Sequence, residues 1–267
     1  MRRRAYCEDM PVVATRTPIE RTSVARVLVT GASGGLGLLT ARSLREAGHE
    51  VVVHARTPAR WDDPVLPDAA YGSLHADLAH TEQVVAMAEA ASAFGPYDAV
   101  IHNAGVLSGP DVLAVNVVAP FVLSALMARP ARVIVLSSSM HRSGSVPVLA
   151  AALEGQVDVS YSDSKLLVTT LVMALARRWP GVACHAVDPG WVPTRMGGPS
   201  APDDLTEGHR TQEWLATADT SEIRPATGGY WHHRRTSRPH RAVLDERVQD
   251  DLIEALEKST GLRLAQA

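Results

Sequence analysis

Residues 26–37 read RVLVTGASGGLG, an apolar β-branched run that ends in a cluster of glycines. The run at residues 26–30 favours a buried strand, because such residues fill a strand that is covered on both sides. The glycines permit positive φ and let the backbone approach a ligand closely. A helical pattern then occupies residues 35–47 and ends at Gly48. The stretch therefore predicts a strand, a tight turn and a helix.

The same alternation of strand and helix continues along the chain. Further strands are expected at Glu50–His54, Ser73–Ala76, Ala99–His102, Arg132–Leu136, Val182–Val187 and Gly229–His232. Further helices are expected at Thr81–Ala93, Val112–Ala128 (with Pro120 as a local irregularity), Tyr161–Trp179 and Glu246–Thr260. Such alternation predicts an α/β fold, a Rossmann-like doubly wound parallel sheet of about seven strands with helices on both faces.

The length of 267 residues suits one large domain, since α/β folds often run to about 250 residues as one unit. We expect a flexible tail over residues 1–23 and a single Rossmann-fold domain over residues 24–267. Residues 196–207 are rich in glycine, proline and aspartate, which predicts a loop.

The composition excludes several classes of protein. A net charge of -3 and an aromatic content of 4% are unlike a nucleic-acid binder. The sequence has no apolar run of about 18 residues, so no membrane span is expected, and no apolar segment of a secretory signal follows Arg2–Arg4. Cys7 and Cys184 lie in unlike surroundings, and no Cys/His cluster has zinc spacing, so neither a disulfide nor a metal is expected. We expect a protein of the reducing cytoplasm.

The glycine-rich turn has the features of a nucleotide-binding site. Its glycines allow close approach to a pyrophosphate, and the following helix offers free N–H groups and the positive end of its dipole. The expected contacts are Thr30, Gly31, Ser33, Gly34, Gly35, Leu36 and Gly37. A tight strand-to-helix connection without a ligand is the alternative interpretation.

The second strand indicates which nucleotide is preferred. It ends in His54-Ala55-Arg56, without the carboxylate that binds the ribose 2′-hydroxyl in NAD sites. Arg56 can pair with a 2′-phosphate, which favours NADP(H) and leaves NAD(H) possible, and a solvated surface arginine is the alternative. Asp77 and Leu78 follow the third strand and lie near the adenine or else belong to a helix cap.

Tyr161 and Lys165 are four residues apart on an expected helix, so they share one face. A free tyrosine titrates near pH ~10 and is a poor proton donor at neutrality. A nearby ammonium favours the phenolate and lowers the pKa of the tyrosine. The pair is therefore a candidate proton donor to a carbonyl that is being reduced, and a solvated helix face is the alternative.

Several motifs in order make the sequence resemble the short-chain dehydrogenase/reductase (SDR) family, in its short single-domain branch, over about residues 24–235. The matching pieces are Thr30-Gly31, Gly35-Leu36-Gly37, Asp77-Leu78, Asn103-Ala104-Gly105, Asn116, Ser137-Ser138-Ser139, Tyr161, Lys165 and Pro189-Gly190-Trp191-Val192-Pro193-Thr194. The position of His141 after the serines is similar to the retinol-dehydrogenase-like branch. Residues 227–233 (TGGYWHH) are similar to ketoreductases of antibiotic pathways. The spacing of Gly31, Gly34 and Gly37 is also the pattern of an epimerase-like branch.

The resemblance implies a role for each of these residues. Tyr161 would be the acid/base, and Lys165 would hold the nicotinamide ribose and lower the pKa of the tyrosine. Ser138, chosen among three consecutive serines, would bind the substrate carbonyl and stabilise oxyanion charge. Asn116 would hold a water in a proton relay to Lys165. The cofactor cleft would be lined by Asn103, Ala104 and Gly105, and the nicotinamide would be seated by Pro189, Gly190, Val192 and Thr194.

The implied activity is that of an NADP-dependent oxidoreductase, which transfers a hydride between the nicotinamide and a carbonyl or alcohol substrate. Two other classes stay open, namely a non-catalytic NADP-binding sensor or interaction protein, and an epimerase or dehydratase on the same fold. The small-molecule substrate is expected to contact a loop over about residues 195–222. Large apolar groups in and beside this loop favour a bulky, mostly apolar ketone or aldehyde, and these are Trp191, Met196, Leu205 and Trp214.

Two further features concern partners. Residues 166–175 are apolar almost all round the expected helix, so one face is expected to meet the sheet and the other a partner copy. With residues 112–128 alongside, this predicts a homodimer or homotetramer, as the resemblance also implies. The basic run at residues 232–241 is expected to be a solvated loop, with binding of an acidic substrate or partner as the alternative. Neither nucleic acid nor membrane is an expected partner.

Overall fold

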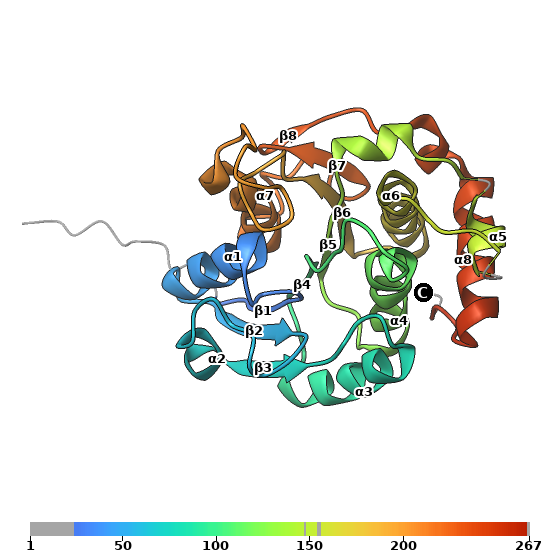
Figure 1. The fold of residues 1–267 in the computed structure, drawn as a ribbon. Coiled ribbons are helices and arrows are strands. Elements are labelled where there is room, and N and C mark those ends of the chain that lie inside the picture. Colours follow the sequence, from blue (N-terminus) through green and yellow to red (C-terminus); the bar gives the residue numbers. More distant parts are fainter. Residues whose placement is uncertain (1–23, 147, 154–155, 266–267) are drawn as a thin grey trace, which may run out of the picture.

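Eight strands form one sheet in the computed structural model, which describes residues 24–146, 148–153 and 156–265 (Figure 1). The strands are β1 (Arg26–Val29), β2 (Glu50–Ala55), β3 (Gly72–His75), β4 (Ala99–His102), β5 (Arg132–Leu136), β6 (Ala183–Asp188), β7 (Gly229–His232) and β8 (Arg235–Thr236). Their order across the sheet is β3-β2-β1-β4-β5-β6-β7-β8. The first seven pair in parallel, and β8 pairs antiparallel with β7. The tail expected over residues 1–23 lies outside the described residues.

The strand order places a topological switch between β1 and β4, where the chain passes from one half of the sheet to the other. Val29 pairs with Val53 on one side and with Ile101 on the other. The carboxyl ends of β1, β2 and β4 therefore lie side by side, which is where doubly wound sheets bind their ligands. The predicted Rossmann-like fold is confirmed, and β8 is an addition that the sequence pattern did not indicate.

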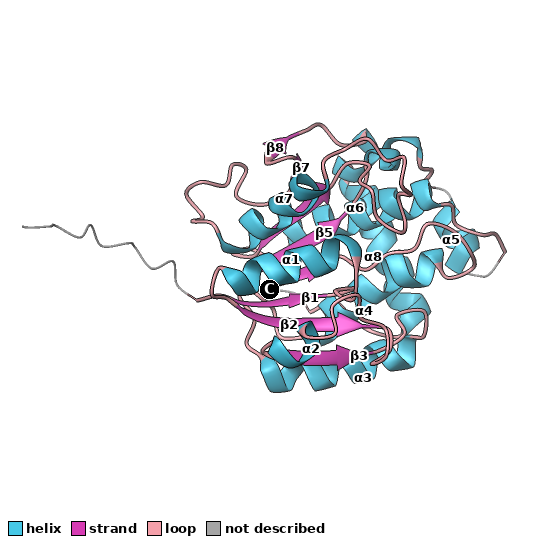
Figure 2. Cartoon of the chain, turned by 60° about the vertical axis from the view of Figure 1, so that its left-hand side comes forward, coloured by secondary structure: helices cyan, strands magenta, loops and turns pink. Residues whose placement is uncertain are grey.

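Helices cover both faces of the sheet (Figures 1 and 2). One face carries α1 (Gly35–Glu46), α2 (Leu66–Ala69) and α7 (Leu205–Thr217), and the other carries α3 (Thr81–Ala91), α4 (Ala119–Leu126) and α6 (Tyr161–Arg178). Outside the second layer lie α5 (Val148–Leu153) and α8 (Glu246–Thr260). An apolar cluster fills the space between the sheet and each helical layer. Within the described ranges, no helix is long and apolar enough to cross a membrane.

The segment expected as one helix at residues 112–128 is divided. A π-helical turn at Ala114–Val118 precedes α4, and Pro120 lies in the first turn of α4. Proline lacks an N–H and suits a first turn, where no helical hydrogen bond is lost. The change of helix type therefore accommodates the proline, and it places Asn116 in the π-helical turn.

Two segments expected as loops contain regular structure. The loop predicted over residues 195–222 includes α7, and Asp204 caps this helix by accepting from the N–H groups of Thr206 at 2.6 Å and Glu207 at 3.1 Å. The basic run at residues 232–241 is not a plain loop, because its first part forms the hairpin of β7 and β8. The loop interpretation is therefore wrong for the parts that form α7 and the hairpin.

Helix α6 is enclosed by its own chain. Its residues 164–175 are all buried. The buried face of α8, with Leu252, Ile253 and Leu256, packs against it. The prediction that a partner copy covers the second face of α6 is therefore wrong, because α8 of the same chain covers that face. Self-association itself stays a prediction.

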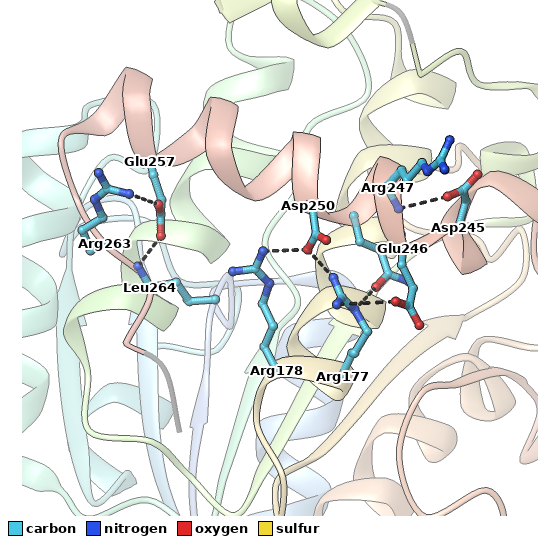
Figure 3. Close-up of polar contacts among 10 residues, drawn as sticks. Arg177, Arg178, Asp245, Glu246, Arg247, Asp250, Glu257, Arg263 and Leu264 are labelled. Atoms are coloured by element: carbon cyan, nitrogen blue, oxygen red, sulfur yellow. Dashed lines mark hydrogen bonds and ion pairs between the residues drawn. The ribbon is translucent and has the colours of Figure 1, made fainter.

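Polar contacts at the end of α6 hold α8 in place (Figure 3). Asp250 of α8 accepts hydrogen bonds from Arg177 and, at 2.7 Å, from Arg178. Nε of Arg177 also donates to the side chain of Gln249 at 3.0 Å. The two arginines and Asp250 are partly exposed, so the apolar contacts supply most of the stabilisation and the ion pairs fix the position of α8.

Candidate active site

The glycine-rich turn joins β1 to α1 and leaves the N-terminus of this helix open. The cap residue is Gly34, no side chain caps the helix, and its first turn has no acidic residue. Glycine is required at two positions of the turn. Gly31 has a φ of +66°, and a Cβ there would lie 2.8 Å from Cα of Ala104, while a Cβ on Gly37 would collide with the carbonyl of Gly31. The first-turn N–H groups are thus available to a bound anion.

His54, a residue that the sequence analysis missed, holds this turn in place. Its Nδ1 accepts from the N–H of Gly31 at 3.1 Å, and its Nε2–H donates to the carbonyl of Ala76 at 3.0 Å. Burial lowers the pKa of His54 to about 4, so the ring is neutral and can accept at one nitrogen. The sequence did contain a signal for this role, because His54 is a polar residue within the otherwise apolar second strand.

A cleft of about 400 Å³ opens at the carboxyl ends of the strands, across the switch point. Most predicted cofactor residues line it together, namely Gly31, Ser33, Gly34, Gly35, Leu36, Arg56, Asp77, Leu78, Asn103, Ala104, Gly105, Tyr161, Lys165, Pro189 and Thr194. Two further arginines, Arg60 and Arg195, line the cleft and were missed from the sequence. In the part of the chain that the structure describes, no group of three or more His, Cys, Asp or Glu side chains could hold a metal ion.

Four predicted cofactor contacts support the wall of the cleft from behind, namely Thr30, Gly37, Gly190 and Val192. Oγ1 of Thr30 accepts from the N–H groups of Asn103 and Ala104, both at 3.1 Å, and so joins the ends of β1 and β4. Gly190 has a φ of +84° in the turn after β6, and Val192 is buried beneath that turn. These residues shape the cleft, and their contact with the cofactor stays a prediction.

Of the predicted catalytic residues, Tyr161 and Lys165 of α6 line the cleft, and Ser138 lies just after β5 beside Tyr161. α6 begins at Tyr161, and a capping box fixes its first turn. The Ser138 hydroxyl lies near enough to the Tyr161 phenol to act on its pKa. One turn further, Lys165 donates from Nζ to the carbonyl of Leu136 at 2.7 Å, and this Nζ lies 5.4 Å from the centre of the Tyr161 ring. The spacing on α6 thus places phenol and ammonium on one face, as predicted.

Burial governs the charge of both groups. It raises the pKa of Tyr161 to about 12, although the nearby Ser138 hydroxyl acts in the opposite direction. It lowers the pKa of Lys165 to about 8, since this side chain is almost fully enclosed. The expected lowering of the Tyr161 pKa by Lys165 is wrong here, because the ammonium is directed to the carbonyl of Leu136 and not to the phenol.

Geometry separates the three consecutive serines. Ser137 is buried, and its hydroxyl pairs with that of Thr169 at 2.6 Å. Ser139 is exposed and begins a 3₁₀ turn. Ser138 is the member whose hydroxyl acts on the pKa of Tyr161. The geometry therefore favours the choice of Ser138.

Asn116 uses its side-chain amide to brace the cleft wall. Its Oδ1 accepts from the N–H of Val106 at 2.8 Å, and its Nδ2 donates to the carbonyl of Val106 and the hydroxyl of Ser164, both at 2.9 Å. A Cβ on Gly105 would lie 3.3 Å from Oδ1 of Asn116 and 3.6 Å from Nζ of Lys165, so this glycine keeps the space between them open. The role of Asn116 in a water relay stays a prediction.

His141 supports the Ser138 turn and was noted in the sequence only as a family feature. It is fully buried, its Nδ1–H donates to the carbonyl of Ser138 at 2.7 Å, and its Nε2 accepts from the N–H of His240 at 2.9 Å. Burial lowers the pKa of His141, which favours the neutral ring that this pattern requires. The last part of the basic run thus braces the turn that holds Ser138.

The large apolar residues expected near the substrate divide between two places. Met196 lines the cleft, and Trp191 is 58% exposed close by in the same loop, where its Nε1–H donates to the carbonyl of Gly197 at 2.8 Å. Trp214 lies on α7 and packs edge-to-face on Trp231, with ring centres 5.2 Å apart. Leu205 and Trp214 are not among the residues that line the cleft, and their contact with a substrate stays a prediction.

The chain belongs to the short-chain dehydrogenase family, whose family model matches residues 25–205. The short-chain dehydrogenase chry4 of Gibberella zeae is 35% identical over 90% of this chain and 99% of its own length, and chyC of Penicillium rubens is 34% identical over the same shares. The crystal structure of NADPH-bound carbonyl reductase from chicken fatty liver has the same fold, with a TM-score of 0.64 and 22% identity over 82% of this chain and 97% of that one. The chain is therefore an NAD(P)-dependent oxidoreductase of this family.

Proposed function

We propose that this enzyme transfers a hydride between NADP(H) and a carbonyl or alcohol substrate that is bulky and mostly apolar. The observation that carries the proposal is the grouping of Tyr161, the Ser138 hydroxyl that acts on its pKa, and the buried Lys165 one helical turn away. Tyr161 and Lys165 both line the cleft. Burying a lysine is costly for the fold. A protein that only bound the nucleotide would have no need of this arrangement.

The residues of the cleft fit NADP(H). The uncapped N-terminus of α1 suits a pyrophosphate, and the glycines of the turn let it approach. Arg56 and Arg60 follow β2 and suit a 2′-phosphate, because a guanidinium can bind it through two hydrogen bonds. The NADPH bound to the chicken carbonyl reductase, which has the same fold, supports this cofactor. NADH is expected to bind more weakly, for lack of the 2′-phosphate.

The side chains then have distinct tasks. When bound, NADP(H) supplies or accepts the hydride. The Tyr161 hydroxyl donates a proton to the substrate oxygen during reduction and takes it back during oxidation. The Ser138 hydroxyl donates a hydrogen bond to the same oxygen and stabilises its developing negative charge. Lys165, a cation below its pKa of about 8, would bind the ribose hydroxyls. Pro189 and Thr194 hold the nicotinamide against them.

The apolar part of the cleft supports the proposed class of substrate. Val106, Val115 and Met196 line it, and Trp191 offers a large exposed surface in the neighbouring loop. An aromatic or polycyclic ketone, or a large aldehyde, buries this surface favourably. We expect short polar carbonyl compounds to be poor substrates.

Consumption of NADPH in the presence of aldehydes, aromatic ketones and polycyclic ketones tests the proposal, with Tyr161→Phe as the matched variant. We expect consumption that depends on the carbonyl compound and on Tyr161. NADPH that binds but is never consumed would favour the sensor. A substrate that changes without net consumption of NADPH would favour an epimerase or dehydratase.

A further inference from the structure

Two loops meet above the glycine-rich turn from opposite sides of the cleft. One follows β2 and contains Asp62, whose N–H donates to the carbonyl of Ser33 at 2.8 Å. The other follows β6 and contains Arg195, whose guanidinium donates to Oδ2 of Asp62 at 2.8 Å. A Cβ added to Gly34 would collide with both side chains. The ion pair therefore lies directly against the cap residue of α1.

Each loop is held by its own anchor. Next to Asp62, Asp63 pairs with Arg42 of α1 at 2.7 Å. On the other side, the hydroxyl of Thr194 accepts from the N–H of Gly197 at 3.2 Å and closes a tight turn around Arg195. Asp62 and Arg195 are about 130 residues apart in the sequence, and two separately anchored loops bring them together.

The charges at this place have a consequence for a bound anion. Asp62 puts a carboxylate beside the open N-terminus of α1, where the pyrophosphate of a dinucleotide is expected. Unless it is neutralised, this carboxylate repels the phosphates. Arg195 neutralises it and itself lines the cleft. Because both side chains are about half exposed, the pair contributes little to the stability of the fold, and its value lies in binding.

We infer that Arg195 binds the pyrophosphate of the cofactor and that Asp62 is the residue that positions Arg195 for this contact. The inference rests on the proposed binding of NADP(H). The guanidinium of Arg195 can bond Asp62 through one N–H group and a phosphate oxygen through another. The pair would then bridge the part of the cleft that holds the pyrophosphate, which in the cofactor lies between the 2′-phosphate side, expected at Arg56, and the nicotinamide.

The test measures dissociation constants by calorimetry for NADPH and for adenosine 2′-monophosphate, a probe that has the 2′-phosphate but no pyrophosphate. Arg195→Ala should weaken NADPH by about tenfold or more, as expected for a lost charge-assisted hydrogen bond. It should leave the binding of adenosine 2′-monophosphate unchanged. Arg210→Ala is the matched control, because Arg210 forms an exposed ion pair with Glu207 on α7, away from the cleft.

Asp62→Asn gives the sharper result, because its effect should change sign. With Arg195 present, the substitution removes the positioning partner and weakens NADPH. In the Arg195→Ala background, it removes an unneutralised carboxylate from beside the phosphates and strengthens NADPH. The same sign in both backgrounds, or equal weakening of both probes by Arg195→Ala, would overturn the inference. Failure of the wild-type protein to bind NADPH would instead overturn the proposed function.

Discussion

Replacing Lys165 with methionine separates two effects of this lysine, namely its cost to the stability of the fold and its contribution to turnover. Lys165 is 4% exposed, and burial lowers its pKa from 10.5 to about 8. The difference corresponds to about 3 kcal/mol by which the folded protein disfavours the charged form. Below pH 8 both the folded and the unfolded chain hold the proton, so this cost is fully present. Between pH 8 and 10.5 only the unfolded chain holds it, so the free energy of unfolding rises with pH.

Lys165→Met removes this dependence on pH. At each pH, the quantity to compare is the free energy of unfolding of the variant minus that of the wild type. This difference should be about 2 kcal/mol larger at about pH 7 than at about pH 9.5. The variant also leaves the carbonyl of Leu136 without its donor, which costs about 1–3 kcal/mol, but this cost is the same at both pH values and cancels in the comparison. Urea unfolding at the two pH values measures the difference.

The chain offers a matched control, because its one other lysine, Lys258, is exposed on α8. Lys258→Met should show no comparable dependence on pH. Turnover by Lys165→Met should be nearly lost, and NADPH should bind more weakly. The variant should therefore be more stable but less active than the wild type. Equal stability differences for Lys165→Met at the two pH values would refute the reasoning that burial of a charge dominates at this residue.

Three further predictions follow from the geometry. Tyr161→Phe should lower turnover by about 10²–10⁴-fold, because it removes the proton donor, while calorimetry should find NADPH affinity unchanged; a folded variant with near-normal turnover would be incompatible with this role. Arg56→Ala should reduce the preference for NADPH over NADH by about tenfold, through loss of the contact with the 2′-phosphate, and equal affinity of the wild type for both cofactors would contradict it. Leu256→Ala, on the buried face of α8, should cost about 2–5 kcal/mol of stability without changing the molar mass in light scattering; a change in mass would mean that the surface of α8 and α6 takes part in assembly.

The parts of the fold that depend on local pattern were predictable. β1, β4, β5 and β7 occupy the ranges that the apolar runs indicated. α8 also begins and ends as expected, since its cap and its final Gly261 are encoded beside it. The ligand cleft followed from the order of strands and helices, because parallel strands bring their carboxyl ends together.

Features that depend on distant parts of the chain were not predictable from pattern. The apolar residues of α6 indicated burial on two sides, but nothing in them distinguished α8 from a partner copy. The spacing of Tyr161 and Lys165 placed both on one face, but the carbonyl of Leu136 that receives the ammonium belongs to another strand. α7 was hidden because the turn residues before Asp204 masked the cap that starts this helix.

The same limit applies to the candidate site. Most residues of the motifs came together in one cleft, since they lie at strand ends or on the helices after them. Arg60, Arg195 and Asp62 lie in loops without a periodic pattern, so their approach to the cleft depends on how those loops fold back. His141 needed the C-terminal segment for its second hydrogen bond, which the sequence does not reveal.

Transfer of deuterium tests the central claim most directly. NADPH that carries deuterium on the reactive carbon of the nicotinamide is incubated with the enzyme and a polycyclic or aromatic ketone, and the alcohol is analysed by mass spectrometry. The account predicts an alcohol with one deuterium on the former carbonyl carbon, formed at least about 100-fold more slowly by Tyr161→Phe. A product without deuterium, or labelled alcohol formed equally fast by the variant, would contradict it.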